Sequence, residues 1–407
     1  MTEISLIEEY STIILITSGL IFAVCCFILF TYFYNRIRKS CGANQSCILD
    51  CEKSGVDFDV DSNNSLLGRG DASIRDMTLS SGSGAGQPKL VQQTIARQLE
   101  KVLIIGRGRY GQVFKAKWRD EYVAVKIFAT TEEASWLREA DMYETPLLQH
   151  NNILGFIAAD ILGTGAVTEM LLVTDYHSNG SLHDYLSMKV LDEESALLLM
   201  HTACAGLCHL HTEIFGKNTK PAIAHRDIKS KNILVKRSGE CVIADLGLSV
   251  RYESSKQTID NPPNNRVGTL RYMAPEILNE SIRLDIFDSF KAADMYSFSL
   301  VLWEIARRCL FDNEVDEYQV PYYNLVPNDP SFEDMRKVVG ACEMRPVLPS
   351  RWFKSYYLEL VAKIMSEGWH QNASVRPTSL RMKKALSRIY LQVIENDKKP
   401  YKAITKE

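Results

Sequence analysis

The sequence predicts an α+β fold of two lobes, a small β-rich lobe and a large helical lobe, preceded by a single transmembrane helix. Three observations support this prediction. An almost unbroken apolar run occupies residues 12–34, a glycine-rich motif lies between strand-like runs at residues 102–118, and motifs of charged residues follow in a fixed order up to residue 376. We expect strands and one helix up to about residue 173, and mostly helices after it.

The apolar run at residues 12–34 is about 23 residues long, and a helix needs about 20 to cross the hydrocarbon core of a bilayer. A buried core helix seldom lacks polar residues over this length. A signal peptide starts with basic residues, whereas this run follows Glu3, Glu8 and Glu9. Basic residues come directly after it, as Arg36, Arg38 and Lys39. The positive-inside rule therefore places residues 1–11 outside the cell and the rest in the cytosol, a single-pass type I orientation in the cell membrane.

The composition excludes some classes of function. A net charge of −3 and the lack of a basic block argue against a nucleic-acid partner. Residues 35–77, rich in Ser, Gly, Asp and Asn, predict a juxtamembrane segment without a packed core. Five cysteines lie in apolar segments without metal-ligand spacing, so we expect reduced core residues: Cys204, Cys208, Cys241, Cys309 and Cys342.

Residues 106–113 have the sequence G-R-G-R-Y-G-Q-V and follow the strand-like run 102–105. Such glycines let backbone N–H groups close over nucleotide phosphates. The same spacing marks dinucleotide-binding folds, but there a helix begins after the third glycine, whereas residues 112–118 continue as a strand. The residues we expect around ATP are Gly106, Arg107, Gly108, Gly111 and Val113.

Lys126 ends the otherwise apolar run 123–126. A buried ammonium is costly unless a carboxylate and a phosphate meet it. Glu139 lies in the helical stretch 134–143, at a suitable distance along the chain, and protein kinases require such a lysine–glutamate pair. We therefore predict catalytic roles for Lys126 and Glu139, and place Ala124 and Lys126 in the nucleotide site.

Residues 225–232 have the sequence H-R-D-I-K-S-K-N, and Asp245 follows 13 positions later. This spacing can bring two carboxylates and a carboxamide around a metal-bound phosphate, which points to phosphoryl transfer. Asp227 is the expected catalytic base, and Asn232 and Asp245 are the expected ligands of Mg²⁺, or of Mn²⁺ in its place. Lys229 would lie beside the transferred phosphate, a position that favours Ser and Thr as acceptors.

Further motifs complete the series. Residues 174–177 predict a hinge that binds adenine through Thr174, Asp175 and His177, with Thr174 as the gatekeeper. An Ala-Pro-Glu motif ends at Glu276, whose expected ion-pair partner is Arg376. Any one of these residues alone would more often be a solvated surface group, but that interpretation does not explain the ordered set.

Residues 99–391 resemble the kinase domain of type I receptors of the transforming growth factor β superfamily, in the activin and bone morphogenetic protein group. The stretches that carry the resemblance are 153–160, 222–227, 243–248, 266–269 and 303–309. The resemblance implies a transmembrane receptor Ser/Thr protein kinase that uses ATP and Mg²⁺. It also implies a hetero-oligomer with a type II receptor kinase, and phosphorylation of serines of receptor-regulated Smad proteins. Residues 392–407 would be a C-terminal tail.

Residues 78–98 resemble the glycine-serine regulatory segment of these receptors, although a flexible linker has a similar composition. Their position between the predicted span and the kinase domain favours the regulatory assignment. By resemblance, a type II receptor kinase phosphorylates Thr78, Ser80, Ser81 and Ser83, and the added charge repositions the segment. Gln87 replaces the leucine at which FKBP12 docks on relatives, so FKBP12 stays an open candidate partner.

A loop between two small-lobe strands selects the Smad substrate in this family. The corresponding residues are Ile161, Leu162, Gly163, Thr164 and Gly165. The Gly-Thr-Gly sequence resembles the bone morphogenetic protein branch, although Leu162 replaces its usual lysine, so the activin branch stays open. Ser299 stands where glycine is usual, and we expect a small residue to be tolerated there.

Residues 1–11 hold no cysteine and are too few to bury a core, so we expect this chain to lack the ligand-binding ectodomain of the family. Two functions follow. The chain is either an active Smad-directed receptor kinase, favoured by the complete catalytic set, or a dominant-negative or scaffolding form that titrates type II receptors or Smads. A soluble tyrosine-kinase-like enzyme fits neither the span nor the glycine-serine segment.

Overall fold

The computed structural model describes residues 94–108, 111–163, 168–260 and 267–397. Within these ranges no helix is both long enough and apolar enough to cross a membrane. Several predicted features lie outside the described residues: the span 12–34, the segment 35–77, Thr78, Ser80, Ser81, Ser83, Thr164, Gly165 and most of the tail.

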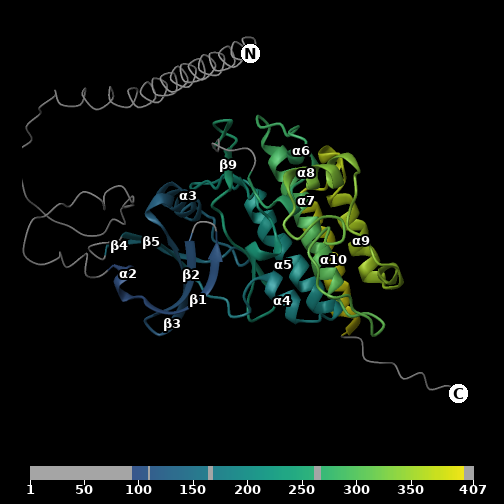
Figure 1. The fold of residues 1–407 in the computed structure, drawn as a ribbon, viewed down its shortest axis with the longest axis horizontal. Helices are drawn as coiled ribbons and strands as arrows, with labels where there is room; N and C mark the ends of the chain where they lie inside the picture. Colours follow the sequence, from purple (N-terminus) through teal and green to yellow (C-terminus); the bar gives the residue numbers. More distant parts are fainter. Residues whose placement is uncertain (1–93, 109–110, 164–167, 261–266, 398–407) are drawn as a thin grey trace, which may run out of the picture. The chain divides into compact units, whose positions relative to one another are not determined.

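The small lobe is an antiparallel sheet of five strands in the order β1-β2-β3-β5-β4 (Figure 1). Val123 and Val125, alternate residues of a central strand, are buried with Leu171 and Val173 of the neighbouring strand, as the period of two requires. The strand-like runs in the sequence are confirmed. The strands are β1 (Glu100–Gly108), β2 (Gly111–Trp118), β3 (Glu121–Phe128), β4 (Phe156–Gly163) and β5 (Thr168–Asp175).

Two helices accompany this sheet, where the sequence analysis expected one. The predicted helix is α3 (Glu133–Tyr143), whose Trp136 indole N–H donates to the carbonyl oxygen of Leu171 at 3.0 Å. The additional helix is α2 (Ile95–Gln98), at the end of the predicted glycine-serine segment. The N–H of Ala96 donates to a carboxylate oxygen of Asp160 on β4 at 2.8 Å, so tertiary contact rather than local propensity holds this short helix.

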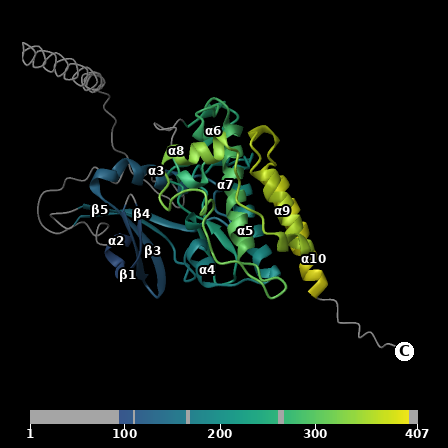
Figure 2. The same ribbon diagram turned by 45° about the vertical axis from the view of Figure 1, so that its right-hand side comes forward.

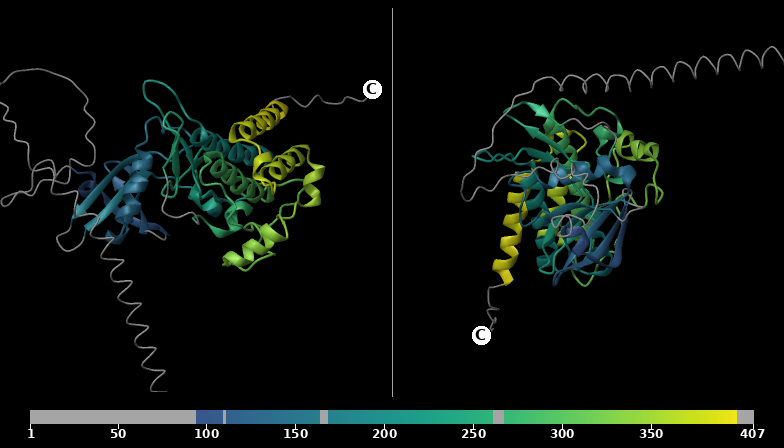
Figure 3. Two further views of the ribbon diagram at one scale, coloured as in Figure 1. Left: turned by 90° about the horizontal axis from the view of Figure 1, so that it is seen from above. Right: turned by 90° about the vertical axis from the view of Figure 1, so that its left-hand side faces the viewer.

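The large lobe is mainly helical, as predicted, and α9 and α10 lie on its side away from the small lobe (Figures 1 and 3). Helix α7 is buried along most of its length and contributes Tyr296 and Trp303 to the core. The helices are α4 (Leu182–Met188), α5 (Glu193–His211), α6 (Pro275–Leu278), α7 (Phe287–Arg307), α8 (Phe332–Met335), α9 (Tyr356–Gly368) and α10 (Ser379–Asp397), with a π-helix at Arg336–Ala341.

Short strands between the helices position the loops with the charged motifs. Figure 2 shows α5 and α7 of this lobe between the small lobe and α10. One sheet has the order β10-β9-β6 and the other pairs β7 with β8. The loop 225–232 therefore runs from β6 to β7, and Asp245 comes just after β8. These strands are β6 (Ala222–Ala224), β7 (Ile233–Val235), β8 (Cys241–Ile243), β9 (Val250–Glu253) and β10 (Thr258–Ile259).

The cysteines of the described residues are free, and four are buried: Cys204, Cys208, Cys241 and Cys309. Burial raises the pKa of the Cys241 thiol to about 12, so this thiol stays protonated and unreactive at neutral pH. Cys342 is exposed, so the expectation of a core position is wrong for this residue. Cys342 directly follows the π-helix Arg336–Ala341, in which Val339 is the buried residue.

Ser299 on α7 lies against Gly368, the last residue of α9. The Ser299 hydroxyl donates to the carbonyl oxygen of Met295 at 2.8 Å, and a Cβ on Gly368 would collide with the hydroxyl oxygen. The same Cβ would lie 2.8 Å from the terminal methyl of Met382 on α10. The hydroxyl of Ser299 therefore fits because residue 368 has no side chain.

We expect Gly368→Ala to lower the free energy of unfolding by about 2 kcal/mol, because the added methyl overpacks a filled space. Adding Ser299→Gly should restore most of this loss, since it removes the colliding atom. Thermal and denaturant unfolding of the two single variants and the double variant measure the coupling. Gly163→Ala, where a Cβ meets no atom of the described residues within 4 Å, is the control. If the loss of unfolding free energy in the double variant equalled the sum of the losses in the two single variants, the packing argument would be contradicted.

Glu276 and Arg376 form the predicted ion pair. Two guanidinium nitrogens lie 2.7 and 2.8 Å from the two carboxylate oxygens, and the Arg376 side chain is fully buried. The guanidinium also donates to the carbonyl oxygens of His370 and Ala292, at 2.8 and 2.9 Å. This bidentate pair joins α6, which contains Glu276, to the segment before α10.

Replacing Glu276 with Gln should lower the free energy of unfolding by about 3 kcal/mol, because a buried guanidinium loses its countercharge. Glu367→Gln is the matched control, since its pair with Arg381 at 2.9 Å is exposed and should be worth less than about 1 kcal/mol. Denaturant unfolding of both variants provides the comparison. Equal losses of unfolding free energy in the two variants would mean that burial of the Glu276–Arg376 pair adds nothing to stability.

Candidate active site

Asp294 of α7 anchors the start of the loop 225–232. Its buried carboxylate accepts the backbone N–H groups of His225 and Arg226 at 2.7 and 2.8 Å. The side chain of His211 contributes a further contact at 3.0 Å. Arg226 has a φ of 68°, a costly conformation for a residue with a side chain. The two hydrogen bonds to Asp294 stabilise this conformation and so direct the next residue, Asp227, toward the activation segment, the stretch from Asp245 to Glu276 that the Ala-Pro-Glu motif closes.

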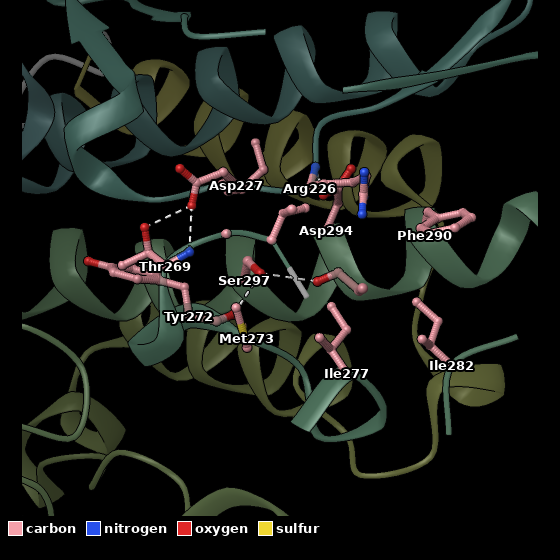
Figure 4. Close-up of a pocket in the computed structure, with 14 residues that line it drawn as sticks. Arg226, Asp227, Thr269, Tyr272, Met273, Ile277, Ile282, Phe290, Asp294 and Ser297 are labelled. Atoms are coloured by element: carbon pink, nitrogen blue, oxygen red, sulfur yellow. Dashed lines mark hydrogen bonds between the residues drawn. The ribbon is translucent and has the colours of Figure 1, made fainter. Parts of the chain in front are cut away.

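Four donors point at the Asp227 carboxylate. One oxygen accepts from the backbone N–H and the hydroxyl of Thr269, both at 2.8 Å (Figure 4). The other accepts from the Lys229 ammonium at 2.6 Å and from the Asn232 amide at 3.1 Å. The Lys229 ammonium also donates to the Thr269 hydroxyl at 2.7 Å. Asp227, Lys229, Asn232 and Thr269 thus form one cluster, as the sequence predicts for all but Thr269.

A pocket of about 20 Å³ adjoins Asp227. Gly268 and Thr269 line it on the side of the activation segment, and Asp294 and Ser297 of α7 on another (Figure 4). Gly268 has a φ of 109°, and a Cβ there would lie 2.7 Å from the carbonyl oxygen of Arg226, so the close approach requires glycine. The activation segment therefore packs directly on the loop that carries the expected base.

Lys126 of β3 meets two carboxylates. Its ammonium lies 2.7 Å from Glu139 of α3 and 3.1 Å from Asp245. Burial lowers the pKa of this ammonium, but the attraction of both carboxylates outweighs burial and keeps the pKa above its usual value. Glu139 is almost completely buried, so the pair is shielded from water. The structure brings together the three residues that the sequence assigned to this part of the site.

Asp245 and Asn232 are brought together by the backbone, since the N–H of Ala244 donates to the carbonyl oxygen of Asn232 at 2.9 Å. Asp245 has a φ of 65°, and its N–H donates to the hydroxyl of Tyr143 at 3.2 Å. Burial raises the pKa of the Asp245 carboxyl, but Lys126 more than offsets this effect, so the pKa is lowered and the group is ionised.

These two side chains fit Mg²⁺, which binds through one or two protein oxygens together with substrate phosphates. Asn232 donates to Asp227 through its amide nitrogen, which turns its carboxamide oxygen away from that contact. The Asp245 side chain is 38% exposed and so accessible to an ion. Among the described residues, no group of three or more His, Cys, Asp or Glu side chains is suited to hold a metal.

The predicted nucleotide residues of the small lobe lie on β1, β2, β3 and β5 of one sheet. Gly106, Arg107 and Gly108 end β1, and Gly111 begins β2, so the glycines form a hairpin. A Cβ on Gly111 would collide with the carbonyl oxygen of Ile127, so glycine is required there. The register then pairs Val113 with Lys126 and Ala124 with Thr174. A strand after the third glycine confirms the distinction from dinucleotide-binding folds.

The hinge begins in the last two residues of β5, Thr174 and Asp175, and continues beyond the strand to His177. Thr174 is buried, and the N–H of Asp175 donates to the carbonyl oxygen of Gly155 at 2.9 Å. A Cβ on Gly155 would collide with the Asp175 carboxylate, so this loop packs tightly behind the hinge. His177 closes a turn with Gly180, and its ring Nε2 is buried without a partner among the described residues.

Sequence reasoning missed three residues that shape this site. Thr269 lies in a stretch that was noted only for its family resemblance, whereas no sequence motif pointed to a role for Asp294 or Tyr143 in the site. Their roles depend on contacts with residues 42 to 102 positions away in the chain. In the loop predicted to select the substrate, Ile161, Leu162 and Gly163 end β4.

Comparison with known proteins agrees with this geometry. A model of the protein kinase domain matches residues 99–391. The chain belongs to the protein kinase family. A model of the transforming growth factor beta type I GS-motif matches residues 73–97 of this kinase, which confirms the predicted resemblance to type I receptors.

Curated relatives of this kinase are receptors. It is 53% identical to activin receptor type-1 of Gallus gallus and 52% identical to that of Homo sapiens, each over 318 residues. It is 55% identical to TGF-beta receptor type-1 of Homo sapiens over 319 residues. These alignments cover 78% of this chain and 62% or 63% of the relatives, so the chain spans less than two thirds of their length.

Proposed function

We propose that this kinase transfers the γ-phosphate of ATP to serine hydroxyls of protein substrates, as a receptor Ser/Thr protein kinase. The cluster of Asp227, Lys229 and Thr269 carries the proposal. An acceptor hydroxyl beside Asp227 would find a base, and the Lys229 ammonium, 2.6 Å from that carboxylate, can offset charge on the transferred phosphate. A lysine two residues after the base is typical of kinases that act on Ser and Thr.

The remaining site residues bind and orient ATP. The glycine hairpin would cover the phosphates, and Thr174, Asp175 and His177 would receive the adenine. Lys126, held by Glu139, would contact the α- and β-phosphates. Asp245 and Asn232 would hold Mg²⁺, which neutralises charge on the β- and γ-phosphates when bound.

We further propose that a type II receptor kinase switches this kinase on by phosphorylating Thr78, Ser80, Ser81 and Ser83. The GS-motif match at residues 73–97 supports this proposal. So does the contact of Ala96 with Asp160, because Asp160 directly precedes the loop from Ile161 to Gly165 proposed to select the substrate. The chain would act in the cell membrane as a hetero-oligomer, and FKBP12 stays an open candidate.

The proposed substrates are receptor-regulated Smad proteins, phosphorylated on their C-terminal serines. The relatives are named as TGF-beta and activin receptors, which supports this substrate class. The loop sequence favours the bone morphogenetic protein branch over the activin branch.

Phosphate transfer from radiolabelled ATP to purified Smad proteins of both branches tests the proposal. The full chain, extracted in detergent, is compared with a variant carrying Asp at positions 80, 81 and 83. We expect transfer to C-terminal serines, increased by the acidic substitutions, and the preferred Smad identifies the branch. No transfer to any Smad or to casein, with ATP shown to bind, would contradict the catalytic proposal and support the titrating role.

A further inference from the structure

A buried carboxylate lies behind the site and takes no part in the proposed chemistry. Glu304 of α7 is fully buried. It accepts hydrogen bonds from three hydroxyl groups: Ser230 at 2.7 Å, Tyr272 at 2.7 Å and Tyr318 at 2.6 Å. Tyr318 in turn contacts the ring of His183 on α4 at 2.7 Å.

The first two hydroxyls belong to the two segments that meet at Asp227. Ser230 directly follows Lys229 in the loop 225–232, and Tyr272 lies three residues after Thr269 in the activation segment. Lys229 and Thr269 both bond Asp227 on the accessible side. Glu304 joins the same two segments on the buried side, so each segment is fixed at two points.

An ionised carboxylate has only acceptor sites, and three hydroxyl donors match it. Burial raises the pKa of Glu304 to about 7, because the donors only partly replace the lost hydration. A core of apolar side chains at this place would avoid that cost. The same lobe contains a simpler buried contact, the hydroxyl pair of Tyr296 and Tyr322 at 2.6 Å.

We infer that Glu304 is a positioning residue for phosphoryl transfer, acting through Ser230 and Tyr272. Its carboxylate sets the separation of the loop 225–232 from the activation segment, and so the place of the acceptor hydroxyl opposite Asp227. The inference rests on the proposed kinase activity. Loss of one hydroxyl leaves Lys126, Glu139 and Asp245 untouched, so the effect belongs to the acceptor side of the reaction and not to ATP binding.

The test compares Tyr272→Phe, Ser230→Ala and Glu304→Gln in the full chain, with casein as a general acceptor and then a Smad protein. We expect each variant to lower kcat by about tenfold, which corresponds to the loss of one charge-assisted hydrogen bond, with the KM for ATP unchanged. Tyr322→Phe is the matched control, because it removes one hydroxyl from an equally buried tyrosine. It should lower the melting temperature to a similar degree and leave kcat within about twofold.

A double-mutant cycle tests the route through Glu304. Tyr272→Phe added to Glu304→Gln should lower kcat no further, since the shared connection is already lost. A wild-type chain that transfers phosphate to no acceptor would overturn the kinase proposal and this inference together. If the wild type is active, two results would overturn the inference alone. The kcat of Tyr272→Phe could equal that of the wild type, or it could fall by no more than the kcat of Tyr322→Phe. The inference would also be overturned if the two substitutions lowered kcat independently, so that their fold-changes multiplied in the double variant.

Discussion

Replacing Asp227 with Asn should lower kcat by about a thousandfold, within the range expected for loss of a positioned general base. The amide presents an NH₂ group to donors that now share two carboxylate oxygens, the Lys229 ammonium and both donors of Thr269. It can neither accept the substrate proton nor satisfy all of these donors. The KM for ATP should stay within about twofold, because within the described part of the chain Asp227 forms no ion pair or hydrogen bond with Lys126 or Asp245.

Initial rates at saturating ATP measure this change, with a melting curve to verify folding. Asp288→Asn on the exposed start of α7 removes the same charge from the same lobe, and it should retain wild-type kcat. A variant of Asp227 that keeps more than about a tenth of the wild-type kcat would exclude the assigned role as base.

Replacing Lys126 with Arg should lower kcat/KM for ATP by at least about a hundredfold, the typical effect of removing one preorganised charge contact. The ammonium lies between Glu139 and Asp245 at 2.7 and 3.1 Å, a space filled by a compact charge. The planar guanidinium is wider and has a different donor geometry. It can retain the ion pair but not place a proton donor where the α- and β-phosphates are expected.

Lys101→Arg is the matched control, since Lys101 forms a pair with Glu169 in the same lobe, also at 2.7 Å but far more exposed. That variant should keep wild-type kcat/KM for ATP, because an exposed pair contributes little. Steady-state kinetics with varied ATP, together with nucleotide binding by titration, separates the two outcomes. Equal activity of the Lys126 and Lys101 variants would remove Lys126 from the site.

The parts of this site that sequence reasoning found share a property. Each is a residue type whose chemistry is costly or unusual in its local setting, such as Lys126 in an apolar strand or the closely spaced glycines of residues 106–111. Their order along the chain then predicted the two lobes and the Glu276–Arg376 pair, which the structure forms. Residue type and motif order along the chain were sufficient for these predictions.

Other parts carried no local signal. The sequence around Thr269 does not indicate that its hydroxyl bonds Asp227. Nor does the sequence of α7 indicate that hydroxyl groups from other segments bond the Glu304 carboxylate. Helix α2 is four residues long, too short to be stable by propensity, and forms against Asp160 of the sheet. Cys342 was placed in the core because its neighbours in sequence are apolar, yet it is exposed.

The sequence by itself determined the family, the division into two lobes and the residue types proposed to bind ATP and metal, because these depend on residues whose spacing along the chain sets their chemistry. Only the tertiary structure decided how the loop 225–232 and the activation segment are held together. Asp294, Thr269 and Glu304 do so through hydrogen bonds with residues 32 to 74 positions away. Hydrogen-bond partners so far apart are chosen by the packing of α7 under both segments, which no local pattern encodes.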